Sequence, residues 1–209
     1  MKILIIGASR GIGLKLLEAA IQQGHIVTAL ARNPEQISLT NERLKIVKGD
    51  IRDQNSLNTA MEGQDVVCSC IGIGPTRKPV TIFSEGTKNI LTAMKKTGIN
   101  LFISVTGIGA GDSKGHGGFL YDKLLQPLLL KTIYEDKDRS EEIIKKSDVN
   151  WIIVRPGFLT NGLVTGKYRV LTDLTGIKVG NISRADVAHF ILNQAEHPQY
   201  LQQTPLLTY

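Results

Sequence analysis

The chain opens with the run Lys2-Ile-Leu-Ile-Ile-Gly7-Ala-Ser9-Arg10-Gly11-Ile12-Gly13. Its Ile and Leu residues predict a strand buried on both faces, which leads directly into a glycine turn and then a helix. Glycine lets the chain reverse tightly at Gly7, lets a pyrophosphate approach the backbone near Gly11, and lets the helix lie close to the strand at Gly13. Amides at the start of such a helix carry partial positive charge toward phosphates. The run therefore predicts a dinucleotide site.

Strands and helices alternate along the rest of the chain, which predicts an α/β fold with a Rossmann-type doubly wound parallel sheet. The length of 209 residues suits one domain, and we expect a single NAD(P)-binding domain over residues 1–209. The expected strands cover residues 3–6, 26–31, 44–47, 65–70, 100–105 and 151–154. The expected helices cover residues 12–23, 53–61, 83–97, 119–133 and 135–147, and a last one begins at 183. Beyond the sixth strand we expect small substrate-side elements, with short strands at 168–171, 177–179 and 206–207.

Composition limits the expected partners and location of the protein. The chain is 42% hydrophobic and 21% charged, and no apolar run approaches the roughly 20 residues that a membrane span needs. Lys2 stands directly before a strand, which is unlike a signal peptide, so we expect a cytoplasmic protein without a membrane partner. The net charge is +6, but the basic residues occur in pairs and not in a stripe, so we expect no nucleic-acid partner. Cys68, Cys70 and four His residues form no metal-ligand pattern, and no metal is expected.

The second expected strand ends in Ala31-Arg32, which bears on the choice of cofactor. NAD-preferring enzymes usually carry Asp or Glu at this place to bind the ribose hydroxyl, whereas a guanidinium attracts a 2′-phosphate. We predict that NADP(H) is preferred over NAD(H), with Arg32 as the main contact and Arg10 as the second. The alternative is that Arg32 is an ordinary exposed charge.

Residues past later strand ends extend the predicted site. Asp50 follows the third strand and can reach the adenine amino group while Ile51 covers the ring, or Asp50 forms a turn or a helix cap. Thr106 ends the fifth strand, where this fold usually keeps catalytic hydroxyls. The segment 107–118 has six glycines in twelve residues. We interpret it either as a substrate lid with His116 at its tip or as a mobile surface loop.

Taken together, the motifs resemble the atypical short-chain dehydrogenase/reductases of the NAD(P)-binding, NmrA-like group, close to the biliverdin reductase B/flavin reductase type. The motifs that carry this resemblance are residues 7–13, Arg32, Gly49-Asp50, residues 84–90 and 105–112, Arg155-Pro-Gly157 and residues 182–188. The resemblance implies that the pyrophosphate is held by Ser9, Arg10, Gly11 and Ile12. It implies that Arg32 holds the 2′-phosphate, that Asp50 and Ile51 hold the adenine, and that Ile71 and Gly72 line the path to the nicotinamide. It also implies a nicotinamide pocket lined by Thr106, Gly107, Pro156, Gly157 and Phe158.

The chain departs from that family at the catalytic residues. Mainstream members use a Tyr-x-x-x-Lys pair, in which the lysine lowers the pKa of the tyrosine so that it can pass a proton. Here Tyr134 is followed by Lys137 one place early, and Tyr121 has no such lysine. The resemblance still places Lys137 near the cofactor ribose. Gly107 and Gly157 stand where the biliverdin/flavin reductase has a serine and a histidine, which argues against biliverdin as the substrate.

Hydride transfer to a flavin or quinone needs mainly proximity and a dry surface, because the acceptor can take its proton from water. We therefore predict an NADPH-dependent reductase of a flat, conjugated small-molecule acceptor, with Thr106 and Lys137 as the catalytic-site residues. We expect it to be a monomer or a small homo-oligomer. The alternative is a non-catalytic NADP(H)-binding redox sensor of the NmrA-like type. A sugar-nucleotide epimerase is disfavoured, because such enzymes generally need the Tyr/Lys pair and a larger C-terminal domain.

Overall fold

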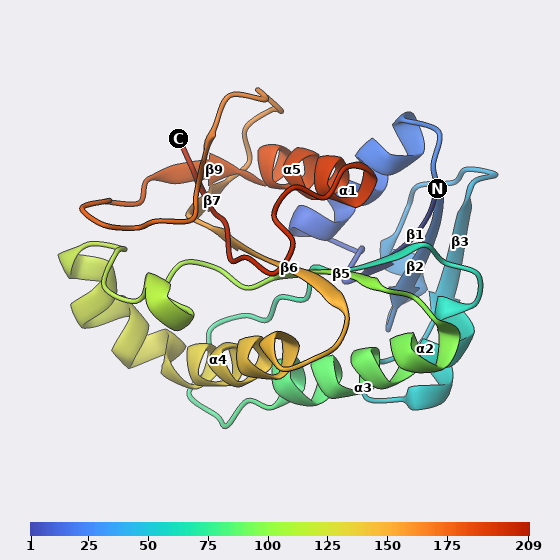
Figure 1. The fold of residues 1–209 in the computed structure, drawn as a ribbon, viewed down its shortest axis with the longest axis horizontal. Helices are drawn as coiled ribbons and strands as arrows, with labels where there is room; N and C mark the ends of the chain where they lie inside the picture. The colour runs from blue at the N-terminus through green and yellow to red at the C-terminus, as the bar shows by residue number, and fades with distance from the viewer.

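The predicted strands form one sheet in the computed structural model, which describes residues 1–209 (Figure 1). The strand order is β3-β2-β1-β4-β5-β6-β10-β8, and all neighbours are parallel except β8, which runs antiparallel to β10. The strands are β1 (Lys2–Ile6), β2 (Ile26–Ala31), β3 (Leu44–Lys48), β4 (Val66–Ser69), β5 (Leu101–Val105), β6 (Asn150–Pro156), β8 (Arg169–Leu171) and β10 (Leu206–Thr208). The order reverses between β1 and β4, so a ligand crevice belongs at their carboxyl ends. The predicted Rossmann-type fold is confirmed.

Five α-helices cover the two faces of the sheet (Figure 1). They are α1 (Gly11–Gln22), α2 (Gln54–Met61), α3 (Ile82–Thr97), α4 (Lys131–Lys145) and α5 (Arg184–Glu196). The larger core cluster lies under α1 and α5, and the second lies under α2, α3 and α4. Helix starts follow local sequence signals, since the Asp53 carboxylate accepts from Asn55 N and Ser56 N, and the Ser183 hydroxyl accepts from Asp186 N.

One prediction about the C-terminal third was wrong. Residues 177–179 are not a strand, because Ile177 and Val179 pack into a small cluster with Ile108 and Leu206 and pair with no other strand. Instead β7 (Phe158–Thr160) and β9 (Asn181–Ser183) form a separate two-stranded parallel sheet. The prediction that residues 119–133 are helical is confirmed. Most of this segment is a π-helix, η3 (Tyr121–Leu130), which continues directly into α4.

The η3 segment exposes most of its large apolar side chains. None of its residues is buried. The exposed large apolar residues here are Phe119, Leu120, Leu124, Leu125, Leu128 and Leu129. They are therefore surface residues and not part of the core. None of the helices combines the length and the apolar character that a bilayer crossing requires.

Candidate dinucleotide site

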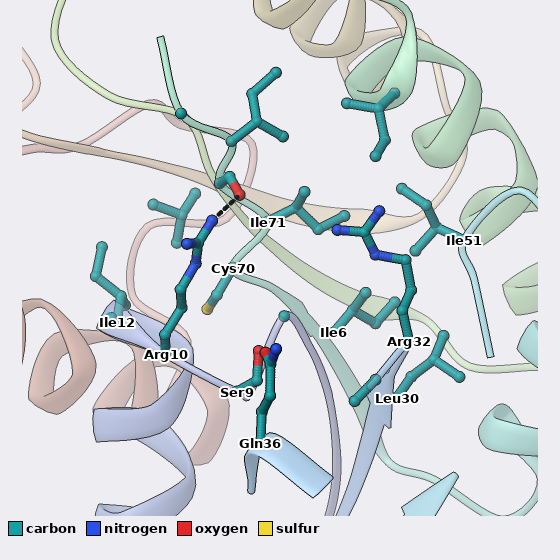
Figure 2. Close-up of a pocket in the computed structure, with 18 of the residues that line it drawn as sticks. Ile6, Ser9, Arg10, Ile12, Leu30, Arg32, Gln36, Ile51, Cys70 and Ile71 are labelled. Atoms are coloured by element: carbon teal, nitrogen blue, oxygen red, sulfur yellow. Dashed lines mark hydrogen bonds between the residues drawn. The ribbon is translucent and has the colours of Figure 1, made fainter. Parts of the chain in front are cut away.

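A cavity of about 760 Å³ opens at the carboxyl edge of the sheet, where the strand order reverses (Figure 2). Its walls come from the first glycine turn and from the loops after β2, β3, β4, β5 and β6. The predicted site residues among its walls are Gly7, Ser9, Arg10, Gly11, Ile12, Arg32, Asp50, Ile51, Ile71, Gly72, Thr106, Lys137 and Pro156. Parts of the chain that are far apart in sequence therefore meet at one cavity, as the motifs predict.

The glycine turn is as tight as the sequence predicts. A Cβ atom added to Gly13 would lie 2.2 Å from the carbonyl oxygen of Gly7, so α1 packs directly against the turn. Gly7 has a φ of +87°, and its Cβ would lie 2.8 Å from the carbonyl oxygen of Cys70. These approaches leave no room for a side chain at either position. Gly13 therefore supports the site through helix packing, although it does not line the cavity.

Arg32 and Asp50 lie at one end of the cavity, together with Ile51. Arg32 is exposed and has no carboxylate within 4.0 Å. One carboxylate oxygen of Asp50 accepts from the backbone N–H of Arg52 at 2.9 Å, so the alternative role of Asp50 in a turn is present. Ile51 is buried, and its side chain packs against Gly86 of α3. This end can accept an adenine ring beside a phosphate.

Arg10 and Arg32 lie on either side of Ile71 in Figure 2. The Arg10 guanidinium donates to the carbonyl oxygen of Gly72 at 3.3 Å. Arg10 directly precedes Gly11 and lines the cavity, as its predicted pyrophosphate role requires. Its second predicted role, contact with a 2′-phosphate, stays a prediction.

Thr106 and Lys137 meet at the opposite end of the cavity. The Thr106 hydroxyl donates to Glu141 Oε1 at 2.7 Å, and Lys137 Nζ donates to the Thr106 carbonyl oxygen at 2.5 Å. The ammonium also lies over the rings of Phe83 and Tyr134, at 5.4 Å and 5.0 Å from their centroids. Burial lowers the pKa of Lys137 to about 8, although the charge of Glu141 acts in the opposite direction. Lys137 is therefore a donor held in place at the cavity wall.

Tyr134 and Tyr121 stand behind this wall. Their hydroxyls lie 3.0 Å apart, and the Tyr121 hydroxyl also lies 3.0 Å from the carbonyl oxygen of Ile108. Neither ring lines the cavity. Burial raises the pKa of both tyrosines, so both stay protonated at neutral pH. No tyrosine of this pair is placed to act as a proton donor toward the cavity.

Of the predicted Pro156-Gly157-Phe158 trio, only Pro156 faces the cavity. The Phe158 ring packs edge-on against Tyr121, with the ring centroids 5.2 Å apart. Gly157 is buried against the backbone of Gly180. A Cβ atom added to Gly157 would lie 2.4 Å from the Gly180 carbonyl oxygen. Because Phe158 begins β7 with its ring turned outward from the cavity, the next residue, Leu159, supplies the wall instead.

The glycine-rich segment 107–118 contacts several other elements, and its role as a substrate lid or a mobile surface loop stays a prediction. Asp112 pairs with Arg155, and Lys114 pairs with Asp138. Asp138 also accepts from the backbone N–H of Gly111 at 2.8 Å. Residues 107–110 and Ser113 are buried. His116 is held as well, with its Nδ1 atom 3.1 Å from the carbonyl oxygen of Ile177. Polar contacts therefore join the segment to β6 through Arg155 and to α4 through Asp138.

Similarity to known proteins identifies the family of this chain. A family model described as NAD(P)H-binding matches residues 7–198. The chain belongs to this NAD(P)H-binding family. An uncharacterised chloroplastic protein of Arabidopsis thaliana, At2g34460, is 30% identical over 207 residues, which cover 93% of this chain and 73% of that protein. The uncharacterised sugar epimerase YhfK of Bacillus subtilis is 28% identical over 198 residues, covering 92% and 86% of the two chains.

Solved structures share the fold across the full chain. ChuY, an anaerobilin reductase of Escherichia coli O157:H7, has a TM-score of 0.84 and 24% identity, covering 100% of this chain and 97% of ChuY. A short-chain dehydrogenase/reductase of Veillonella parvula in complex with NADP has a TM-score of 0.81 and 18% identity, covering 100% and 94%. The resemblance to short-chain dehydrogenase/reductases is thereby confirmed at the level of fold.

Sequence reasoning missed several cavity residues of this family member. They are Asn33, Gln36, Ile73, Leu159, Asn161 and Arg184. Arg184 lies inside a motif that carried the family resemblance, but that motif predicted only the start of a helix. An arginine in the first turn of a helix is unfavourable next to the positive end of the helix dipole, which was an available signal for another role.

The pKa of Lys137 tests whether its ammonium group is buried at the cavity wall. In protein with 13C-labelled lysine side chains, we expect one Cε resonance to titrate near pH 8, against 10.5 for an ordinary lysine. Because the folded pKa is the lower one, burial of the ammonium destabilises the fold below about pH 8. That cost disappears as the pH rises from about 8 to 10.5.

The resonance should vanish in Lys137→Met and persist in the control Lys146→Met, since Lys146 is exposed at the C-terminal end of the same helix. If every lysine titrates above about pH 10, the Lys137 assignment is wrong.

Proposed function

We propose that this NAD(P)H-binding protein is an NADPH-dependent reductase that transfers hydride to a flat, conjugated acceptor such as a flavin or a quinone. The observation that carries the proposal is one continuous cavity that runs from Arg32 to Pro156 and Leu159. Arg32 at one end suits a phosphate group, and the other end has Pro156 and Leu159 beside Thr106 and Lys137 and no acidic residue. Such an acceptor needs proximity and exclusion of water more than it needs a protein acid.

The charge of the cavity supports NADPH over NADH. Four cationic side chains line it, namely Arg10, Arg32, Lys137 and Arg184, against the single carboxylate of Asp50. No carboxylate stands at the end of β2, where it would accept from a ribose 2′-hydroxyl and repel a 2′-phosphate. Arg32 there presents a guanidinium that no acid of the protein neutralises.

The bound nicotinamide would supply the hydride, and the protein would bind and orient the cofactor. The residues present fit such a group: the glycine turn admits a pyrophosphate, and Thr106 and Lys137 fix polar atoms at the far end. Glu141 orients the Thr106 hydroxyl. Pro156 and Leu159 exclude water from the ring and leave the acceptor to take its proton from solvent.

The test is turnover with a panel of acceptors. Purified protein should oxidise NADPH when it is given FMN, dichlorophenolindophenol or a small quinone, and it should do so faster than with NADH. Mixtures without protein measure the direct reaction between NADPH and each acceptor. Tight binding of NADPH without turnover across the panel would refute the reductase.

That outcome would favour the second candidate, a non-catalytic NADP(H)-binding redox sensor. One observation supports the sensor specifically: the Tyr121 and Tyr134 hydroxyls bond to each other behind the cavity wall. The site therefore offers no tyrosine acid to a substrate. For the enzyme we propose a small-molecule acceptor, a cytoplasmic location, and action as a monomer or a small homo-oligomer.

A further inference from the structure

Arg184 is a cationic residue of the cavity to which the proposed function assigns no role of its own. It is the first residue of α5 and follows β9 directly. Thr160 of β7 pairs in register with Ser183 of β9, so Asn161 and Arg184 emerge side by side from the small sheet. Arg184 Nη1 donates to Asn161 Oδ1 at 2.7 Å, and both residues line the cavity. The hydrogen bond to Asn161 therefore orients the Arg184 guanidinium at the cavity wall.

The guanidinium lies over the glycine turn. A Cβ atom added to Gly11 would lie 4.0 Å from Arg184 Nε. Helices α1 and α5 pack side by side (Figure 1), and Leu16 and Val187 belong to the same buried cluster. This packing fixes the distance between the guanidinium and the amides at which α1 begins. An anion bound to those amides would therefore lie between them and the Arg184 guanidinium.

No acid of the protein neutralises this arginine. Arg184 forms no ion pair. Asp186, the only acid in the first turn of α5, directs its carboxylate to the Thr165 and Gly166 amides and to the Tyr209 hydroxyl instead. A cation at a helix start also opposes the helix dipole. The local structure thus gives Arg184 a charge that an external anion would balance.

We propose that Arg184, aimed by Asn161, is a ligand of the cofactor diphosphate and holds it against the Gly11 and Ile12 amides. The inference rests on the proposed dinucleotide function and extends it to the C-terminal third of the chain. A diphosphate bound in this way joins two parts of the protein. Leu159 stands two residues before Asn161, so the same contact fixes the apolar wall beside the nicotinamide end.

The binding test compares nucleotides with and without a diphosphate, by calorimetry on the full chain. Arg184→Ala should weaken NADP+ and NAD+ by the same factor, about tenfold, because a charge-assisted hydrogen bond is lost from both. Adenosine 2′-monophosphate, which has no diphosphate, should bind unchanged. Arg184→Lys should recover part of the loss. The matched control is Arg43→Ala, since Arg43 is exposed outside the cavity.

A second readout separates binding from folding. NADP+ should slow hydrogen exchange in residues 158–166 of the wild type, and Arg184→Ala should abolish that protection at saturating NADP+. If Arg184→Ala leaves both dinucleotide affinities unchanged, the inference is overturned while the proposed function stands. The inference is also overturned if Arg184→Ala raises only the KM of an acidic acceptor. Arg184 would then bind the acceptor and not the cofactor. If the wild type binds no dinucleotide, the proposed function fails as well.

Discussion

Replacing Arg32 by Asp is expected to raise the Kd for NADPH about 100-fold and to leave the Kd for NADH nearly unchanged. Charge-assisted hydrogen bonds contribute about 1.5–3 kcal/mol, and 1.4 kcal/mol corresponds to a factor of ten. The substitution removes one such contact with the 2′-phosphate and adds a repelling carboxylate at the same place. Arg32 carries this expectation because it lines the cavity and has no acidic partner of its own.

Calorimetry with both reduced cofactors measures the effect. Arg43→Asp makes the same change of charge at an exposed residue outside the cavity, so it reports any general effect of net charge. Higher salt should weaken the difference between the cofactors, because the contact is partly exposed to solvent. Equal losses for NADPH and NADH would show that Arg32 does not contact the 2′-phosphate.

Replacing Glu141 by Ala is expected to lower the free energy of unfolding by about 3–5 kcal/mol. Glu141 and Arg155 are both fully enclosed, and two guanidinium nitrogens of Arg155 donate to the two carboxylate oxygens at 3.1 Å and 2.5 Å. Removing the carboxylate leaves a buried arginine with only Asp112, and it also removes the acceptor of the Thr106 hydroxyl. Urea denaturation measures the change, and NADPH turnover should fall with it.

The neighbouring Glu142 provides the control, because it is exposed on the same helix. Glu142→Ala should change the free energy of unfolding by less than about 0.5 kcal/mol. A loss below about 1 kcal/mol in Glu141→Ala would mean that the ion pair adds little to the fold.

Acid should act on the same network through Asp112. Burial acts to raise the pKa of Asp112, but the hydrogen bond and charge of Arg155 outweigh it and hold the pKa below its ordinary 3.8. The stabilisation by Asp112 is therefore present above about pH 4 and is lost as the pH falls below that value.

The sequence predicted the parts of this molecule that depend on near neighbours. The Ile-rich run and the glycines after it are adjacent, so strand, turn and helix follow from local preference. Asp53 and Ser183 likewise predict helix starts from a few residues. Arg32 could be placed in the site because a parallel strand brings its end to a known edge of the sheet.

The error lies where distant segments pair. Residues 177–179 have the composition of a strand, but they pair with no strand. The segment Phe158–Thr160 pairs instead with Asn181–Ser183. That pairing also puts Asn161 beside Arg184, and no local pattern connects them. The contacts of segment 107–118 likewise join distant residues, because Arg155 and Asp138 come from elements later in the chain.

The two ends of the cavity are built by separate stretches of the chain. Arg32, Asp50 and Ile51 come from its first quarter, whereas Leu159 and Asn161 come from its last third. For the reductase that we propose, a change in the early stretch would alter the choice between NADPH and NADH and leave the residues at the other end unchanged. Evolution of such a reductase would then adjust the source of reducing equivalents and their destination independently.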